Sequence, residues 1–107
     1  NGINVIVQSL EGLDAGELLE LSDRYKQKHA PAAIVLGSQD DGKVHLVANF
    51  DASVAERMSA SDVVRQAAAI VGGGGGGRPT LARAGGKDPA KLPEALAEAE
   101  RLILSAL

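Results

Sequence analysis

The feature that most constrains this chain is the segment GGGGGGRPTLARAGG at residues 72–86, which opens with six consecutive glycines and ends with two more. A flexible linker is the usual interpretation of such a run. Here, however, the run is flanked by helix-like sequence inside one domain's length of chain, and the residues after it lack linker composition. Because glycine loses more backbone freedom on folding than any other residue, an ordered run implies that something approaches its backbone closely.

Nucleotide-binding loops fit this segment poorly. A triphosphate-binding loop needs Lys-Ser/Thr after its glycines and a strand before them, whereas Arg78-Pro79 follows here and the preceding sequence is helical. A dinucleotide fingerprint fails for the same reason. A helix N-terminus that favours an anion remains open, with Pro79 as the first residue of a short helix over PTLARA that ends at Gly85. Arg78 would then lie at the helix start and Arg83 about one turn further on.

Charge and composition favour folded RNA as the partner. The chain carries a net charge of −3, but residues 72–91 hold four basic side chains against one aspartate. Only 2% of the residues are aromatic, so a stacking platform for single strands is not expected, and contact with the shape of a folded RNA fits better. The candidate nucleic-acid-binding residues are Gly72, Gly73, Gly74, Gly75, Gly76, Gly77, Arg78, Arg83, Gly85, Gly86 and Lys87.

Other classes of site are not supported. The chain has no cysteine, which excludes disulfides and thiolate metal sites and is compatible with a cytoplasmic location. His29 and His45 lie on separate predicted elements, so we expect no metal site, and no catalytic constellation is present. No stretch approaches the roughly 18 apolar residues that a membrane span requires, so we expect no membrane partner.

The pattern of the remaining sequence predicts one α/β domain over residues 1–107, with a small mixed sheet flanked by helices. We expect strands at 2–10, 32–38 and 43–50, and helices at 13–29, 59–71 and 87–107. Asp14 and Glu17 form a capping box, Ser59 or Ser61 caps the second helix, and Gly72 ends it. A strand-helix-strand unit followed by a hairpin gives a mixed sheet. The glycine-rich segment is expected to be a loop before the C-terminal helix.

The predicted C-terminal helix has an apolar stripe at alternating spacings of four and three residues. Such a stripe faces a core in most proteins, but at the end of a chain it can also serve a partner. A homodimer through this helix is therefore open. The stripe comprises Leu92, Leu96, Ala99, Ile103 and Ala106.

Residues 71–96, VGGGGGGRPTLARAGGKDPAKLPEAL, resemble the C-terminal domain of alanyl-tRNA synthetases, whose usual pattern is GGxGGGRPxxAxAGG. The order of elements before this motif is also similar. The accessory domain of DHH phosphoesterases is related, but usually has a histidine after its glycines where this chain has Arg78. A basic residue is common within the synthetase run, where this chain has Gly74 or a neighbour, and Thr80 and Arg83 replace an acidic residue and a glutamine.

The resemblance implies a non-catalytic tRNA-binding domain that is a piece of a longer alanine–tRNA ligase. It would bind the tRNA body, at the outer corner where the D and T loops meet, while aminoacylation and editing domains act on the acceptor end. The parent would use ATP with magnesium, and zinc in its editing domain, with no cofactor in this fragment. Three alternatives stay open: a stand-alone editing protein as the parent, a substrate-binding accessory domain of a DHH-type phosphoesterase, or an oligomerisation domain.

Overall fold

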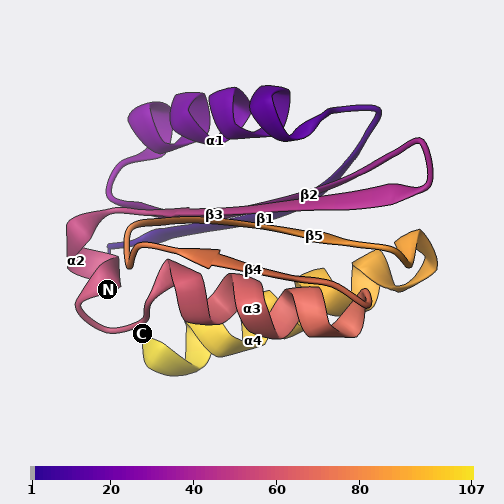
Figure 1. The fold of residues 1–107 in the computed structure, drawn as a ribbon. Coiled ribbons are helices and arrows are strands. Elements are labelled where there is room, and N and C mark those ends of the chain that lie inside the picture. Colours follow the sequence, from indigo (N-terminus) through magenta and orange to yellow (C-terminus); the bar gives the residue numbers. More distant parts are fainter. Residues whose placement is uncertain (1) are drawn as a thin grey trace.

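A five-stranded mixed sheet, with helices on both faces, forms the frame of the chain (Figure 1). The computed structural model describes residues 2–107, so Asn1 of the domain predicted over 1–107 lies outside the described residues. The strands are β1 (Asn4–Glu11), β2 (Ala32–Asp40), β3 (Lys43–Phe50), β4 (Gly74–Gly77) and β5 (Leu81–Gly86). The helices are α1 (Ala15–His29), α2 (Ala52–Ala55), α3 (Ala60–Ile70) and α4 (Leu92–Ala106), with a 3-10 turn at Pro89–Lys91.

The strands are ordered β1-β2-β3-β5-β4, which confirms the predicted mixed sheet. β1 runs parallel to β2, as the intervening helix α1 requires, and every other neighbouring pair is antiparallel. The hairpin between β2 and β3 turns at Asp41 and Gly42, whose φ angles are 53° and 78°. Positive φ at both central residues is the geometry of the tight hairpin turns that match strand twist.

Helix α1 covers one face of the sheet over β2 and β3. It begins with the predicted capping box, in which the Asp14 carboxylate accepts the Glu17 amide and the Glu17 carboxylate accepts the Asp14 amide. Leu18 is its buried apolar contact. A buried polar link adds to the packing, because the Asn49 side-chain amide on β3 donates to Ser22 Oγ (3.1 Å) and to Asp23 Oδ1 (2.8 Å).

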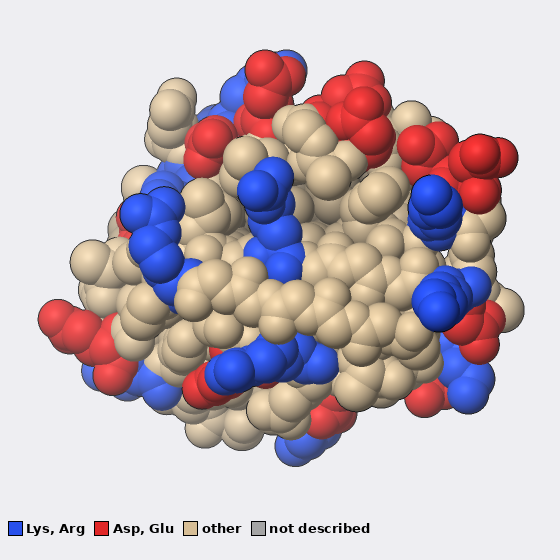
Figure 2. Space-filling model, in the orientation of Figure 1, with Lys and Arg blue, Asp and Glu red and all other residues tan. Residues whose placement is uncertain are grey.

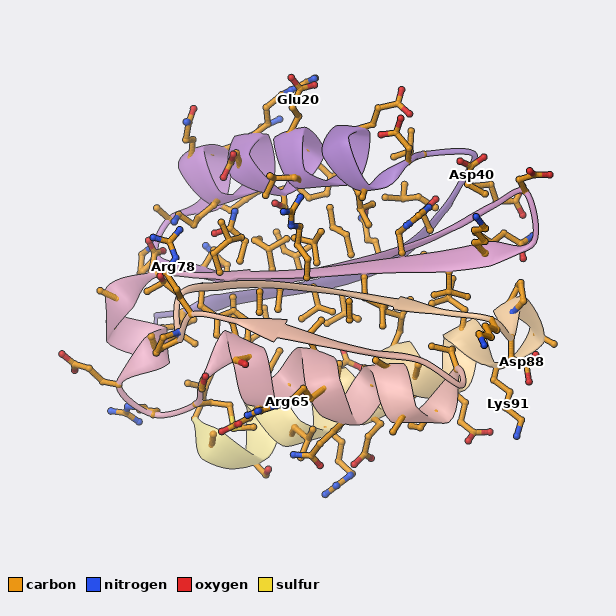
Figure 3. All side chains as sticks on the ribbon, viewed as in Figure 1. Glu20, Asp40, Arg65, Arg78, Asp88 and Lys91 are labelled. Atoms are coloured by element: carbon orange, nitrogen blue, oxygen red, sulfur yellow. The ribbon has the colours of Figure 1, made fainter. Side chains whose placement is uncertain are left out.

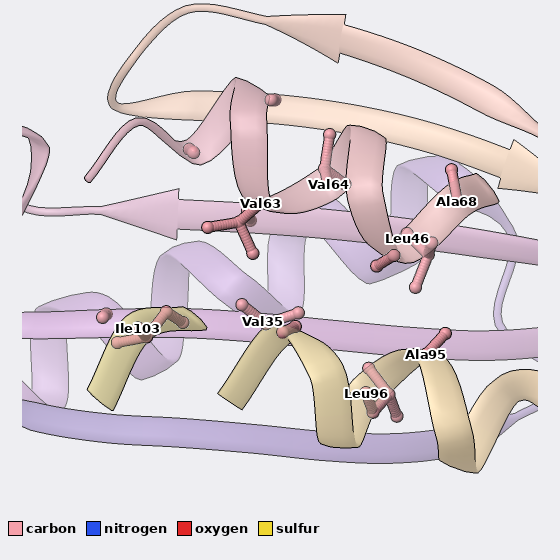
Figure 4. Packing of buried hydrophobic residues seen from close by; sticks show 14 of the residues in the cluster. Val35, Leu46, Val63, Val64, Ala68, Ala95, Leu96 and Ile103 are labelled. Atoms are coloured by element: carbon pink, nitrogen blue, oxygen red, sulfur yellow. The ribbon is translucent and has the colours of Figure 1, made fainter. Parts of the chain in front are cut away.

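The larger core lies between the sheet and the pair α3 and α4 (Figure 4). Ala67 and Ala68 let α3 pack closely on the sheet because they carry only a methyl group. The stripe on α4 also faces this core: Leu92, Leu96, Ala99 and Ile103 are buried, while Ala106 is half-buried. The core-facing interpretation of the stripe is therefore confirmed.

Both ends of α3 lie where the sequence predicts them. Ser59 is the N-cap, with its hydroxyl accepting the amide of Ser61. At the other end Gly72 adopts a φ of 70°, its amide donates to the Ala69 carbonyl, and the Gly73 amide donates to the Ala68 carbonyl. These two bonds form the Schellman motif that favours glycine after a helix. They also turn the chain so that the next residues run back alongside α3.

The segment after α3 differs from expectation in two ways. Four of the six consecutive glycines form a strand, β4, and the predicted short helix over PTLARA is absent because Leu81–Gly86 forms strand β5. Pro79 therefore starts no helix and lies in the turn between the two strands. The physical reason is tertiary: β3 offers an open edge, and β5 pairs with it through Ala48 and Ala82. The period-two alternation of small and larger residues fits that edge.

Candidate nucleic-acid interface

The outer half of the sheet, formed by β5 and β4, is covered on one face only. Helix α3 packs on both strands from one side, whereas α1 on the opposite side lies over β2 and β3 (Figure 1). The face of β5 and β4 on the α1 side is therefore open beside α1. We call this open face, together with the turn at residues 78–80, the glycine shelf.

Strand alternation decides which side chains reach the glycine shelf. On β5, Ala82 is buried in the core on the α3 side, so Leu81, Arg83 and Gly85 face the other way. The ladder with β4 places Gly76 opposite Arg83 and Gly74 opposite Gly85. A hollow of about 210 Å³ lies at the turn end of this surface. Its lining comprises Gly76, Gly77, Arg78, Leu81, Ala82 and Arg83.

Alternate glycines of the run are required by β5 itself. A Cβ atom on Gly73, Gly75 or Gly77 would lie under 3.0 Å from main-chain atoms of β5, a separation that side chains do not tolerate. Gly86 is restricted in the same way by Val71. The close approach that the glycine run implied is thus made within the domain, where two backbones pack against each other.

An added Cβ atom would meet few neighbouring atoms at Gly74, Gly76 and Gly85. A Cβ on Gly74 would have no atom within 4 Å, one on Gly85 would make an ordinary contact at 3.5 Å, and one on Gly76 would lie 3.2 Å from Ser61 Oγ. Packing therefore does not explain the missing side chain at Gly74. The result is a stretch of bare main chain on which a ligand could lie directly against the backbone.

The turn between β4 and β5 is held from three sides. The Arg78 amide donates to the Leu81 carbonyl (2.9 Å), the Ala60 amide at the start of α3 donates to the Pro79 carbonyl (2.8 Å), and the Phe50 amide donates to the Thr80 carbonyl (2.8 Å). The Ala60 amide is thereby satisfied by protein rather than open to an anion. Arg78 projects from a fastened turn, and it is exposed.

Three exposed cations border the glycine shelf: Arg78 at the turn, Arg83 on β5 and Lys87 just after β5. Within residues 2–107, no ion pair engages any of them. Arg65 on α3 differs, since it is paired with Asp62. Figure 3 shows Arg78 at the turn end of β4 and Arg65 on α3 below it.

Basic side chains border an uncharged band on this side of the molecule. Figure 2 shows this band across the front with basic side chains above and below it, and acidic side chains along the upper rim and at the edges of the view. Within the described residues, unpaired cations therefore lie beside the bare backbone, although the whole chain is acidic. Such a local basic surface is the electrostatic signature of a nucleic-acid contact.

Other chemistry is not evident in the part of the chain that the structure describes. Residues 2–107 contain no group of three His, Asp or Glu side chains placed to hold a metal, and no helix long and apolar enough to cross a membrane. The ring of His29 packs edge-on against Tyr25, whereas His45 lies on β3. The Asp51 carboxylate accepts the amide of Ala32 and so fastens the start of β2.

Comparison with known proteins gives consistent matches. The model of the DHHA1 domain matches residues 2–105. The chain is 48% identical over 103 residues to the alanine–tRNA ligase of Hydrogenovibrio crunogenus and 51% identical over 96 residues to that of Ralstonia nicotianae, covering 96% and 90% of this chain. It spans only 12% and 11% of the length of these curated relatives.

Two solved structures have the same fold. The C-Ala domain of Aquifex aeolicus alanyl-tRNA synthetase superposes with a TM-score of 0.82 at 30% identity, covering 96% of this chain and 90% of that one. RecJ of Thermus thermophilus superposes with a TM-score of 0.65 at 19% identity, over 97% of this chain and 15% of RecJ. The RecJ likeness establishes a shared fold.

Proposed function

The chain belongs to the DHHA1 domain family and is similar throughout to the C-terminal domain of alanyl-tRNA synthetases, and from this premise we propose that it binds tRNA through the glycine shelf. The observation that carries the proposal is the pairing of a bare glycine backbone with Arg78 and Arg83. Guanidinium groups suit phosphate oxygens, and a surface without side chains admits the sugar–phosphate backbone closely. Lys87 extends the positive border along β5.

Folded tRNA fits the glycine shelf better than a single strand. The only Phe, Trp or Tyr residues in the chain are Tyr25 and Phe50. Tyr25 lies on α1, where its hydroxyl donates to Gln8, and Phe50 is fully buried. Neither offers a base-stacking platform at the shelf, so binding rests on charge and shape. The outer corner of the tRNA is the part we assign to this surface.

In the parent enzyme, the domain would hold the tRNA body while other domains act on the acceptor end. We place that parent in the cytoplasm. The parent's ATP with magnesium, and the zinc of an editing domain, would be bound by segments outside this chain. A stand-alone editing protein could carry the same domain and would use the glycine shelf in the same way.

Titration of the 107-residue chain with an alanine-tRNA transcript tests the proposal. We expect salt-sensitive binding that weakens when Arg78 or Arg83 is replaced by alanine. The control ligand is a short single strand taken from the same tRNA. Tighter binding of the short strand than of folded tRNA would instead favour the DHH-type alternative, an accessory domain that grips single strands.

An oligomerisation role is a second candidate, because Leu104 on α4 is 56% exposed. The apolar stripe of α4 is used in the core, so a homodimer would need the outward face of the helix. That face carries the Glu98–Arg101 pair, in which the hydrogen bond from Arg101 lowers the pKa of Glu98. Sedimentation over a range of concentrations tests this role, and a monomer at every concentration would exclude it.

A further inference from the structure

One side chain fastens the end of β4 that precedes Arg78. The Gly77 amide donates to Ser61 Oγ at 3.2 Å, although the two residues are 16 positions apart in the chain. The remaining bonds that hold the adjoining turn join main-chain atoms, through Arg78, Pro79 and Thr80. A substitution at Ser61 can therefore loosen this end of β4 without changing the residues of the adjoining turn.

The position of Ser61 is well suited to that role. It lies in the first turn of α3, on the side of β4 opposite the glycine shelf, and its side chain is largely buried, with 8% of the residue exposed. The same hydroxyl is the atom that a Cβ on Gly76 would meet. Gly76 and Gly77 both line the hollow beside Arg78 and Arg83. Ser61 thus contacts β4 from the α3 side and does not reach the surface of the glycine shelf.

We infer that Ser61 is a positioning residue for tRNA binding, acting through Gly77 to hold Arg78 at a fixed place relative to Arg83. This inference rests on the proposed function of the glycine shelf. Glycine has more backbone freedom than any other residue, so a strand of glycines such as β4 needs bonds from other segments to hold its conformation. A surface that is ordered before binding loses less conformational entropy when the ligand arrives.

The test compares Ser61→Ala with wild type and with Ser59→Ala in titrations with an alanine-tRNA transcript at several salt concentrations. Ser61→Ala is expected to weaken binding about three- to tenfold, the range set by loss of one neutral hydrogen bond. The salt dependence of log Kd should keep its slope, because no phosphate contact is removed. Ser61→Thr retains the hydroxyl and should restore the affinity.

Ser59→Ala is the matched control, since it removes the N-cap bond to the Ser61 amide and lowers stability while it keeps the Ser61 hydroxyl that accepts the Gly77 amide. Amide hydrogen exchange gives a readout independent of RNA: the Gly77 amide should exchange faster in Ser61→Ala than in Ser59→Ala. Unchanged tRNA affinity in Ser61→Ala, or an equal loss in Ser59→Ala, would overturn the inference.

The two proposals fail in different ways. If the wild-type chain does not bind tRNA, or if Arg78→Ala and Arg83→Ala bind as tightly as wild type, the glycine shelf is not the interface and the inference falls with it. If wild type binds and the arginine variants weaken binding while Ser61→Ala does not, the proposed function stands and only the role of Ser61 is rejected.

Discussion

Gly76 lies directly opposite Arg83 in the antiparallel ladder between β4 and β5. An exposed guanidinium thus projects beside a residue that has no side chain, so nothing on the neighbouring strand shields the charge or pairs with it. Neither Arg83 nor Arg78 takes part in an ion pair within residues 2–107. Both cations are therefore available to an anionic ligand without breaking an existing pair.

Replacing Arg83 or Arg78 by alanine should weaken tRNA binding and reduce the slope of log Kd against log salt by about one for each phosphate that is no longer neutralised. Filter binding or fluorescence anisotropy between about 50 and about 200 mM salt measures both quantities. Arg101→Ala is the control, because Arg101 is exposed on α4 and paired with Glu98. Equal salt slopes for all the variants and wild type would contradict the assignment of the interface.

Gly74→Ala and Gly75→Ala should have opposite effects on stability although the residues are adjacent. Alanine at position 74 meets no atom within 4 Å and removes an entropic cost, so stability should rise by about 0.5 kcal/mol. Alanine at 75 would collide with the backbone of β5 and should lower stability by about 1–3 kcal/mol. Urea denaturation distinguishes these results. Equal free energies of unfolding would refute the division of the glycines into those that the backbone of β5 requires and those that it does not.

A lysine at position 74 should strengthen tRNA binding. The side chain would enter open space on the edge strand opposite Gly85, which adds a cation near the glycine shelf without disturbing the fold. We expect tighter binding at low salt and a salt slope steeper by about one. Gly74→Gln, of similar length but neutral, is the matched control. If the Lys and Gln variants bind equally, position 74 does not face the RNA.

Asn49→Ala should destabilise the chain by about 1–3 kcal/mol, because it breaks the buried link to Ser22 and Asp23 and loosens α1 on β3. The midpoint of urea unfolding is the measurement. Ser105→Ala is the comparison, since its hydroxyl donates to a carbonyl of its own exposed helix turn and should matter little. An unchanged midpoint for Asn49→Ala would show that apolar packing alone holds α1.

Local signals in the sequence predicted local structure well. Asp14 and Glu17 marked the start of α1, Gly72 marked the end of α3, and the spacing of Leu92, Leu96 and Ile103 identified the buried side of α4. Each of these depends on residues within one or two helical turns, so the information is contained in a short stretch of chain.

The error at residues 79–84 has a long-range cause. Pro79 followed by small residues is compatible with a helix, and only the open edge of β3 makes this stretch a strand. The Ser61–Gly77 bond is also invisible in sequence, because serine in the first turn of a helix is ordinary capping chemistry. The cluster of basic residues beside the glycines can be read from the sequence, whereas the hydrogen bonds that support it join segments far apart in the chain.

The Schellman motif at Gly72 and Gly73 and the turn at Arg78 have a consequence for the alignment of the sheet. In most strands the pattern of side chains selects one pairing with the neighbour, but four identical residues supply no such pattern. The alignment of β4 on β5 is therefore defined where the strand is anchored: at the end of α3, at the Ser61–Gly77 hydrogen bond and at the turn. Which β4 residue pairs with which β5 residue is thus set by the anchors of the strand and not by its own residues.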